Sequence, residues 1–198
     1  MTGVASPMLK AFPARGVRFV TGLLVGGVAA GLLLSLAVYL IGSSAVALLP
    51  SRNRLLIVAG IAMTLGIADV IGRTPSINRQ VPQRMVRSVP AGFLGLTYGF
   101  DLGLLFTTQK TTSLIWLAIA MALLLEPASS PLILLAIALG AAGIVVLVSF
   151  ILNGDMARIE GPLLINGRHL SVVDHIRKGT GLLILATVPI LAWQALIA

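Results

Sequence analysis

The sequence predicts an all-α protein, a polytopic bundle of transmembrane helices. Hydrophobic residues make up 58% of the 198 positions and charged residues 10%, and the mean hydropathy is +1.05. A soluble domain of this length needs a far more polar exterior. The apolar residues form long runs without the alternation of barrel strands, and in lipid a helix satisfies its backbone groups internally. We therefore expect a single membrane domain over residues 1–198, with about five spanning helices.

The first two apolar runs are expected to form a transmembrane hairpin. Residues 19–41 follow a basic N-terminal segment and have about the 20-residue length that a spanning helix needs. Pro50 lies in a short turn, and residues 55–72 form the second expected span. Near the end of that span, Asp69 stands four residues before Arg73, and this spacing favours a local ion pair on a helix.

Three further spans are expected over residues 98–125, 132–152 and 179–197. Residues 73–93 form a basic, proline-containing linker, and residues 153–178 form a charged loop with an interfacial segment. Because Lys and Arg concentrate in cytoplasmic loops, both are expected on the cytoplasmic side. This pattern places the N-terminus inside and the C-terminus outside.

Polar side chains interrupt the start of the third expected span. Those able to contact a polar solute or an ion are Asp101, Thr107, Thr108, Gln109, Lys110, Thr111 and Thr112. Ionisable groups at membrane depth are costly and are functional candidates by default. Two interpretations stay open. Either Lys110 reaches the headgroups and Asp101 is interfacial, or both are buried in a span that is tilted or broken near Gly103 or the threonine cluster.

The partner of a buried Lys110 is also open. Asp101 and Lys110 would lie about 180° apart on a continuous helix, so they can pair only if that helix is broken. Asp69 is the candidate partner on another span and joins the set of expected binding residues. A hydrolase built on Asp69 and Asp101 has no supporting motif.

Glycines at small-xxx-small spacing are expected to pack helices closely. They are Gly22, Gly26, Gly95, Gly99 and Gly103. One fixed offset along the chain pairs Gly22 with Gly103 and Pro50 with Pro131. This pairing indicates a parallel duplication of a two-helix hairpin.

Several classes of protein are not favoured. The net charge of +8 comes from Lys and Arg between apolar runs, where they determine topology, so no nucleic-acid partner is expected. Cysteine is absent and there are two histidines, which makes a weak case for a metal, and we expect no cofactor. Zinc-helix, nucleophile-elbow and phosphate-loop motifs are missing, so the sequence gives no support for an enzyme.

The run from Gly99 to Gly103, continued to Thr107 and Thr108 after a basic linker, resembles a segment of small actinobacterial membrane proteins. These are proteins of the methylamine-utilisation MauE and cytochrome-c-biogenesis CcdA kind. In the CcdA family, paired cysteines pass reducing equivalents across the membrane. This sequence has no cysteine, so that activity and its site residues do not transfer. The resemblance implies a small bacterial inner-membrane protein.

From these patterns we expect an integral protein of the bacterial cytoplasmic membrane that binds or translocates a small polar solute or ion on its third span. The alternative is a non-catalytic membrane protein that assembles or stabilises another membrane protein through glycine faces. The expected partners are the lipid bilayer and either a membrane protein or a second copy of the chain.

Overall fold

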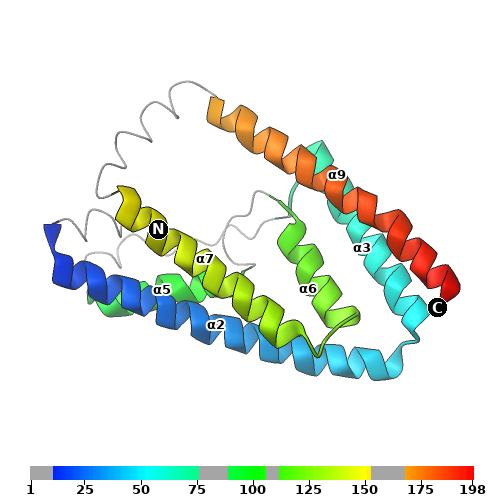
Figure 1. The fold of residues 1–198 in the computed structure, drawn as a ribbon, viewed down its shortest axis with the longest axis horizontal. Helices are drawn as coiled ribbons and strands as arrows, with labels where there is room; N and C mark the ends of the chain where they lie inside the picture. The colour runs from blue at the N-terminus through cyan, green and yellow to red at the C-terminus, as the bar shows by residue number, and fades with distance from the viewer. Residues whose placement is uncertain (1–10, 76–88, 106–111, 153–167) are drawn as a thin grey trace. The chain divides into compact units, whose positions relative to one another are not determined.

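The structure, a computed structural model, describes residues 11–75, 89–105, 112–152 and 168–198. All regular secondary structure in these ranges is helical, which confirms the all-α fold class. The helices in chain order are α2 (Pro13–Leu48), α3 (Ser51–Ile71), α5 (Ala91–Gly103), α6 (Leu114–Leu124), α7 (Ser130–Leu152) and α9 (Arg168–Ile197) (Figure 1).

Within the described residues, four helices are long and apolar enough to cross a membrane. They are α2, α3, α7 over Ser130–Val148 and α9 over Val173–Ile197. Length and composition are thus those of a multi-pass membrane protein. The expectation of about five spanning helices is corrected to four, because the third expected span is not one helix.

The third apolar segment is interrupted. α5 has 13 residues and α6 has 11, and each is shorter than the roughly 20 residues that span a hydrocarbon core. α5 ends at Gly103, and Leu105 has a φ of 62°, a left-handed conformation that leucine rarely adopts and that cannot continue a right-handed helix. The span expected over 98–125 is therefore broken, and the break falls near Gly103, one of the two places considered.

The chain divides into two compact units. The first unit holds the chain up to Leu33, Asn78–Thr108 and Leu135–His169. The second unit holds Leu34–Ile77, Gln109–Leu134 and Leu170–Ala198. Each is described by itself below.

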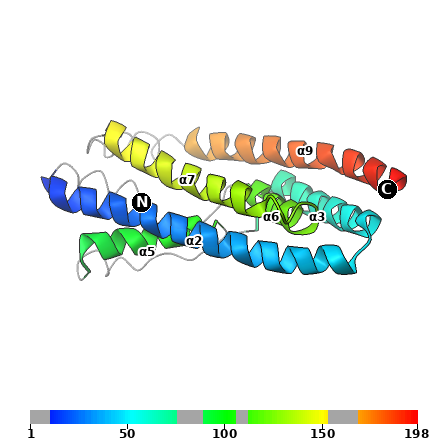
Figure 2. The ribbon, with the colours of Figure 1, turned by 60° about the horizontal axis from the view of Figure 1, so that its bottom comes forward.

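In the first unit, α5 runs parallel to the first half of α2 with the two backbones in contact (Figures 1 and 2). A Cβ built at Gly95 would lie 2.0 Å from the carbonyl oxygen of Phe19, and one at Gly99 would lie 2.0 Å from that of Leu23. Gly103 repeats this contact against Gly27 one turn further on. No residue other than glycine fits at such contacts, which explains the four-residue spacing.

The rest of the first unit packs on this pair. Gly27 and Gly31 of α2 lie against Ala142 and Ala138 of α7, so α7 runs antiparallel to α2 here. A core cluster of buried residues includes Phe19, Leu23, Leu94, Leu102 and Ala142. The small residues of α2 therefore bring two other helices close to its axis.

In the second unit, α3 is antiparallel to both α6 and α9. Gly66 of α3 contacts Leu185 and Gly181 of α9, and Gly181 in turn contacts Val70. The shared core comprises Val58, Ala59, Ala62, Leu117, Leu124, Ile184 and Leu191. α3 is therefore the central helix of this unit.

Two further expectations concern the start of the last helix and the repeat of the two hairpins. α9 begins at Arg168 and continues through its apolar residues without a break, so the charged residues before Gly179 and the expected last span lie on one helix. The interfacial position of the charged part stays a prediction. α3 begins directly after Pro50 and α7 directly before Pro131. The superposition of the two hairpins stays a prediction.

Candidate functional site

The most buried ionisable side chain among the described residues is Asp69, in the last turn of α3. It is 0% exposed. Its Oδ2 accepts the backbone N–H of Ser113 at 2.7 Å, and its Oδ1 accepts the Ser113 hydroxyl and the Thr74 hydroxyl, both at 2.7 Å. These short, charge-assisted bonds offset the cost of removing a carboxylate from water.

Asp69 caps α6 from another helix. Ser113 is the N-cap residue of α6 and makes no side-chain bond to its own helix. In a capping box, an acid three residues into the helix accepts the N–H of the N-cap residue. Asp69 supplies that acceptor from α3, and its charge lies at the positive end of the α6 dipole.

The opposite end of α6 meets a cation from the same helix α3. The Nη1 of Arg54, in the first turn of α3, donates to the carbonyl oxygen of Leu124 at 3.0 Å. That carbonyl belongs to the last turn of α6, where backbone oxygens have no partner within the helix. α3 thus holds α6 at both ends, with the sign of each charge matched to the helix dipole.

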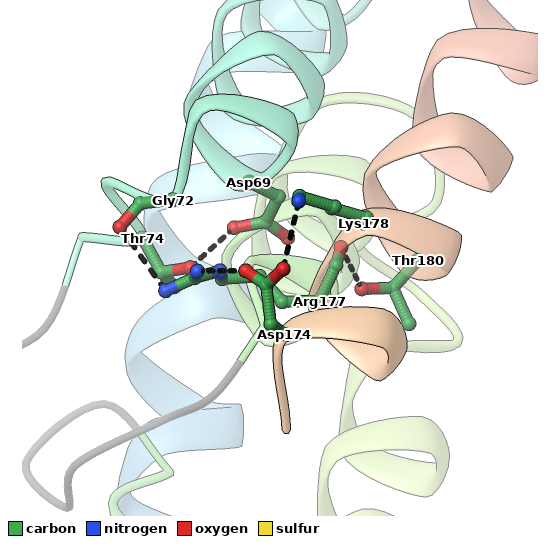
Figure 3. Close-up of polar contacts among 7 residues, drawn as sticks. All are labelled: Asp69, Gly72, Thr74, Asp174, Arg177, Lys178 and Thr180. Atoms are coloured by element: carbon green, nitrogen blue, oxygen red, sulfur yellow. Dashed lines mark hydrogen bonds and ion pairs between the residues drawn. The ribbon is translucent and has the colours of Figure 1, made fainter. Parts of the chain in front are cut away.

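A basic cluster, defined here as Arg73 at the end of α3 with Arg177 and Lys178 of α9, lies in the second unit. Figure 3 shows Arg177 and Lys178 near Asp69. Gly72 has a φ of 88° and ends α3, with Arg73 N–H donating to Ala68 and Gly72 N–H to Asp69 backbone oxygen. The Nη1 of Arg177 from α9 donates to the Gly72 carbonyl at 3.1 Å. A Cβ at position 72 would lie 2.9 Å from that guanidinium, which is the flexible end of a side chain, so the positive φ is what favours glycine here.

Asp174 of α9 holds the cations of this cluster in place. Its carboxylate pairs with Arg177 one turn further along α9, and its Oδ2 lies 2.7 Å from the Nζ of Lys178 (Figure 3). The Asp69–Arg73 pair expected from spacing does not form. Arg73 is exposed, and Asp69 uses its oxygens for Ser113 and Thr74.

An open apolar pocket of about 460 Å³ lies between α3 and α6. Its walls are Ile61, Leu65, Pro75, Trp116, Ile119, Ala120, Leu123 and Leu124. The Nε1 of Trp116 donates to the carbonyl oxygen of Pro75 at 3.0 Å at one end. This pocket suits an alkyl group, and it has no polar wall to orient a polar solute.

Asp101, in the first unit, is placed differently from Asp69. It lies in the last turn of α5 and is 8% exposed. The C-terminal end of a helix carries negative partial charge, so a buried carboxylate there is disfavoured by its own helix and requires positive charge or donors nearby. The Asp69 carboxylate stabilises the N-terminal end of α6, whereas the Asp101 carboxylate lies at the C-terminal end of α5, which carries partial charge of the same sign.

The other expected binding residues divide into two groups. Thr112 is partly buried just before Ser113. The remaining members, Thr107, Thr108, Gln109, Lys110 and Thr111, lie outside the described residues. The five glycines expected to pack helices all lie in α2 and α5, where their backbones touch. No group of three or more metal-ligating side chains occurs in the described ranges.

Ser113, Thr74 and Arg54 are not among the site residues predicted from the sequence. A signal for Ser113 exists, because a serine directly before an uninterrupted apolar run marks a helix N-cap. The roles of Thr74 and Arg54 depend on contacts between α3 and α6 that no local pattern encodes. Comparison of the chain with protein-family models, with curated proteins and with solved structures gave no match.

Proposed function

We propose that this membrane protein binds a small cation or cationic solute at the interruption that follows α5, with Asp101 as the anionic ligand. The observation that carries this proposal is the position of Asp101, buried in the last turn of a helix that ends at Gly103. A positive ligand there would be attracted by both the carboxylate and the helix terminus. Interrupted helices commonly form such sites in transporters.

Asp69 is left out of this site for a physical reason. Its carboxylate already accepts three hydrogen bonds and has no exposed surface. A ligand could reach it only by displacing the cap of α6. Translocation of the ligand remains part of the proposal, because four helices in the described residues are long and apolar enough to cross a membrane. Polar and ionisable residues within such a protein commonly mark the pathway of a solute or ion.

The test is thermal unfolding of the purified protein in detergent with a panel of inorganic cations and small amines. A ligand that binds only the folded state at 100 times its Kd adds about 2.7 kcal/mol of stability. We expect at least one member of the panel to raise the Tm of the wild type and not that of Asp101→Asn. Glu126→Gln, which neutralises an exposed acid, is the matched control and should respond like the wild type. No response in the wild type, or an equal response in Asp101→Asn, would overturn the proposal.

A second candidate function is the assembly or stabilisation of another membrane protein. It is favoured by a face of α7 on which Ala136, Gly140 and Gly143 are exposed, and a Cβ built at either glycine meets no atom within 4 Å. Small residues of this kind let a second helix approach closely. Gly140→Leu should then remove a partner that co-purifies with the wild type, while leaving any cation response intact.

A further inference from the structure

The pocket between α3 and α6 and the basic cluster adjoin each other in the second unit. Pro75 forms one wall of the pocket and stands two residues after Arg73. Its carbonyl accepts the indole N–H of Trp116, which also lines the pocket. The end of the apolar pocket formed by Pro75 and Trp116 is therefore two residues along the chain from the charged end of α3.

The charge of that surface is positive. Arg73 is exposed, and the side chain of Lys178 is 54% exposed. Arg177 is held on the carbonyl oxygen of Gly72, the residue directly before Arg73 in the sequence. Among the described residues, the accessible acid at this surface is Asp174, which is shared by Arg177 and Lys178, whereas Asp69 is fully buried under its donors. The excess of cations favours an anionic group at this end of α3.

We propose that the second unit binds one anionic phospholipid, with an acyl chain in the pocket and the phosphate at Arg73 and Lys178. Both halves of the site support this class of ligand. A soluble anion would leave the apolar walls uncovered, and an uncharged lipid would leave the cations without a counter-charge. Trp116 lies at the junction with its N–H bonded and its ring apolar, as tryptophans do at headgroup level.

The tryptophan content allows a direct test. The chain has two tryptophans, and Trp116 becomes the sole one in a Trp193→Phe background. Brominated acyl chains quench a tryptophan that they touch. The protein is reconstituted in phosphatidylcholine vesicles containing increasing fractions of phosphatidylglycerol with brominated chains. A parallel series uses phosphatidylcholine with the same brominated chains.

We expect the mole fraction of brominated lipid that gives half-maximal quenching of Trp116 to be at least about fivefold lower for the anionic lipid. Each cation near the surface should strengthen binding of an anionic lipid by about that factor. Arg73→Gln and Lys178→Gln should each reduce this preference about fivefold without abolishing quenching by either lipid. Arg52→Gln, the same change at the other end of α3, should leave it unchanged. Ala120→Phe, which fills the pocket, should weaken quenching by both lipids.

Trp193 supplies the internal control. It is 66% exposed near the end of α9, away from the basic cluster in sequence, and in a Trp116→Phe background it should be quenched equally by both lipids. Equal quenching of Trp116 by both lipids would reduce the site to ordinary lipid contact and overturn the proposal. Absence of quenching would overturn it as well, because the pocket would then hold no acyl chain.

Discussion

The backbone N–H of Ser113 donates to Oδ2 of Asp69 at 2.7 Å, across 44 residues of sequence. Through this bond Asp69, in the last turn of α3, caps the first turn of α6. The Ser113 hydroxyl bonds to the second oxygen of the same carboxylate, so Ser113 uses both of its donors on Asp69. Asp69 thus stabilises the start of α6 both by acceptors in the right place and by negative charge at the positive end of the helix dipole.

This geometry predicts a graded response to substitution of Asp69. Asp69→Asn keeps one oxygen for the Ser113 N–H, and the two hydroxyls can turn to accept from the new amide, so we expect a loss of about 1 kcal/mol. Asp69→Ala leaves the N–H without an acceptor in a buried position and should cost about 3 kcal/mol. The free energy of unfolding in a mixed-micelle titration measures both. Equal losses would contradict the capping role.

Lys110 and Asp69 should be energetically independent. The oxygens of Asp69 are occupied by Ser113 and Thr74, so Lys110→Leu and Asp69→Asn should add within about 0.5 kcal/mol in a double-mutant cycle. The parallel cycle with Asp101→Asn tests the other pairing considered for Lys110. A coupling energy between Lys110 and Asp69 well above that value would contradict this prediction and support a buried pair between the two residues.

The glycines of α5 predict a large effect from one methyl group. Gly99→Ala places a Cβ about 2 Å from the Leu23 carbonyl, so α2 and α5 must separate at a cost of about 3 kcal/mol. Gly140→Ala is the matched control, because no atom lies within 4 Å of its Cβ, and it should be neutral or slightly stabilising. Thermal unfolding in detergent compares them, and similar Tm values for the two variants would show that the backbone contact is not formed.

The side of the membrane on which the C-terminus lies shows whether the interrupted segment of α5 and α6 crosses the membrane. If α5 and α6 together cross the membrane, the number of crossings is odd and the two chain termini lie on opposite sides. If they return to the side on which they began, the termini lie on the same side. The basic residues of 153–178 favour a complete crossing, since the positive-inside rule then places that segment in the cytoplasm. A reporter after Ala198 should therefore read outside, and one between Arg79 and Arg87 inside.

The sequence predicts the helices better than it predicts their ends. Apolar runs indicate α3 and α7 to within a few residues, because burial in lipid requires a long uniform stretch. The same reasoning gives 19–41 for a helix that extends over Pro13–Leu48. Hydropathy marks only the part that must be apolar, whereas the helix continues for as long as its backbone bonds form.

The candidate site could be predicted only in part. Asp69 and Asp101 are conspicuous because acids are rare in apolar segments, and both are buried. Their different roles depend on helix ends: α6 begins beside Asp69, and α5 ends just after Asp101. The prediction of a local ion pair between Asp69 and Arg73 was wrong. Ser113, which is 44 residues further along the sequence, gives Asp69 better hydrogen-bond donors.

The capping of α6 at both ends also constrains how the protein is made. An 11-residue helix is too short to be stable alone or to enter a bilayer by itself, and its two caps, Asp69 and Arg54, belong to a helix synthesised earlier. We therefore expect α3 to be in place before residues 113–124 form a stable helix. On this view the second unit assembles in order, and the folding of the short helix depends on a helix that was made earlier in the same chain.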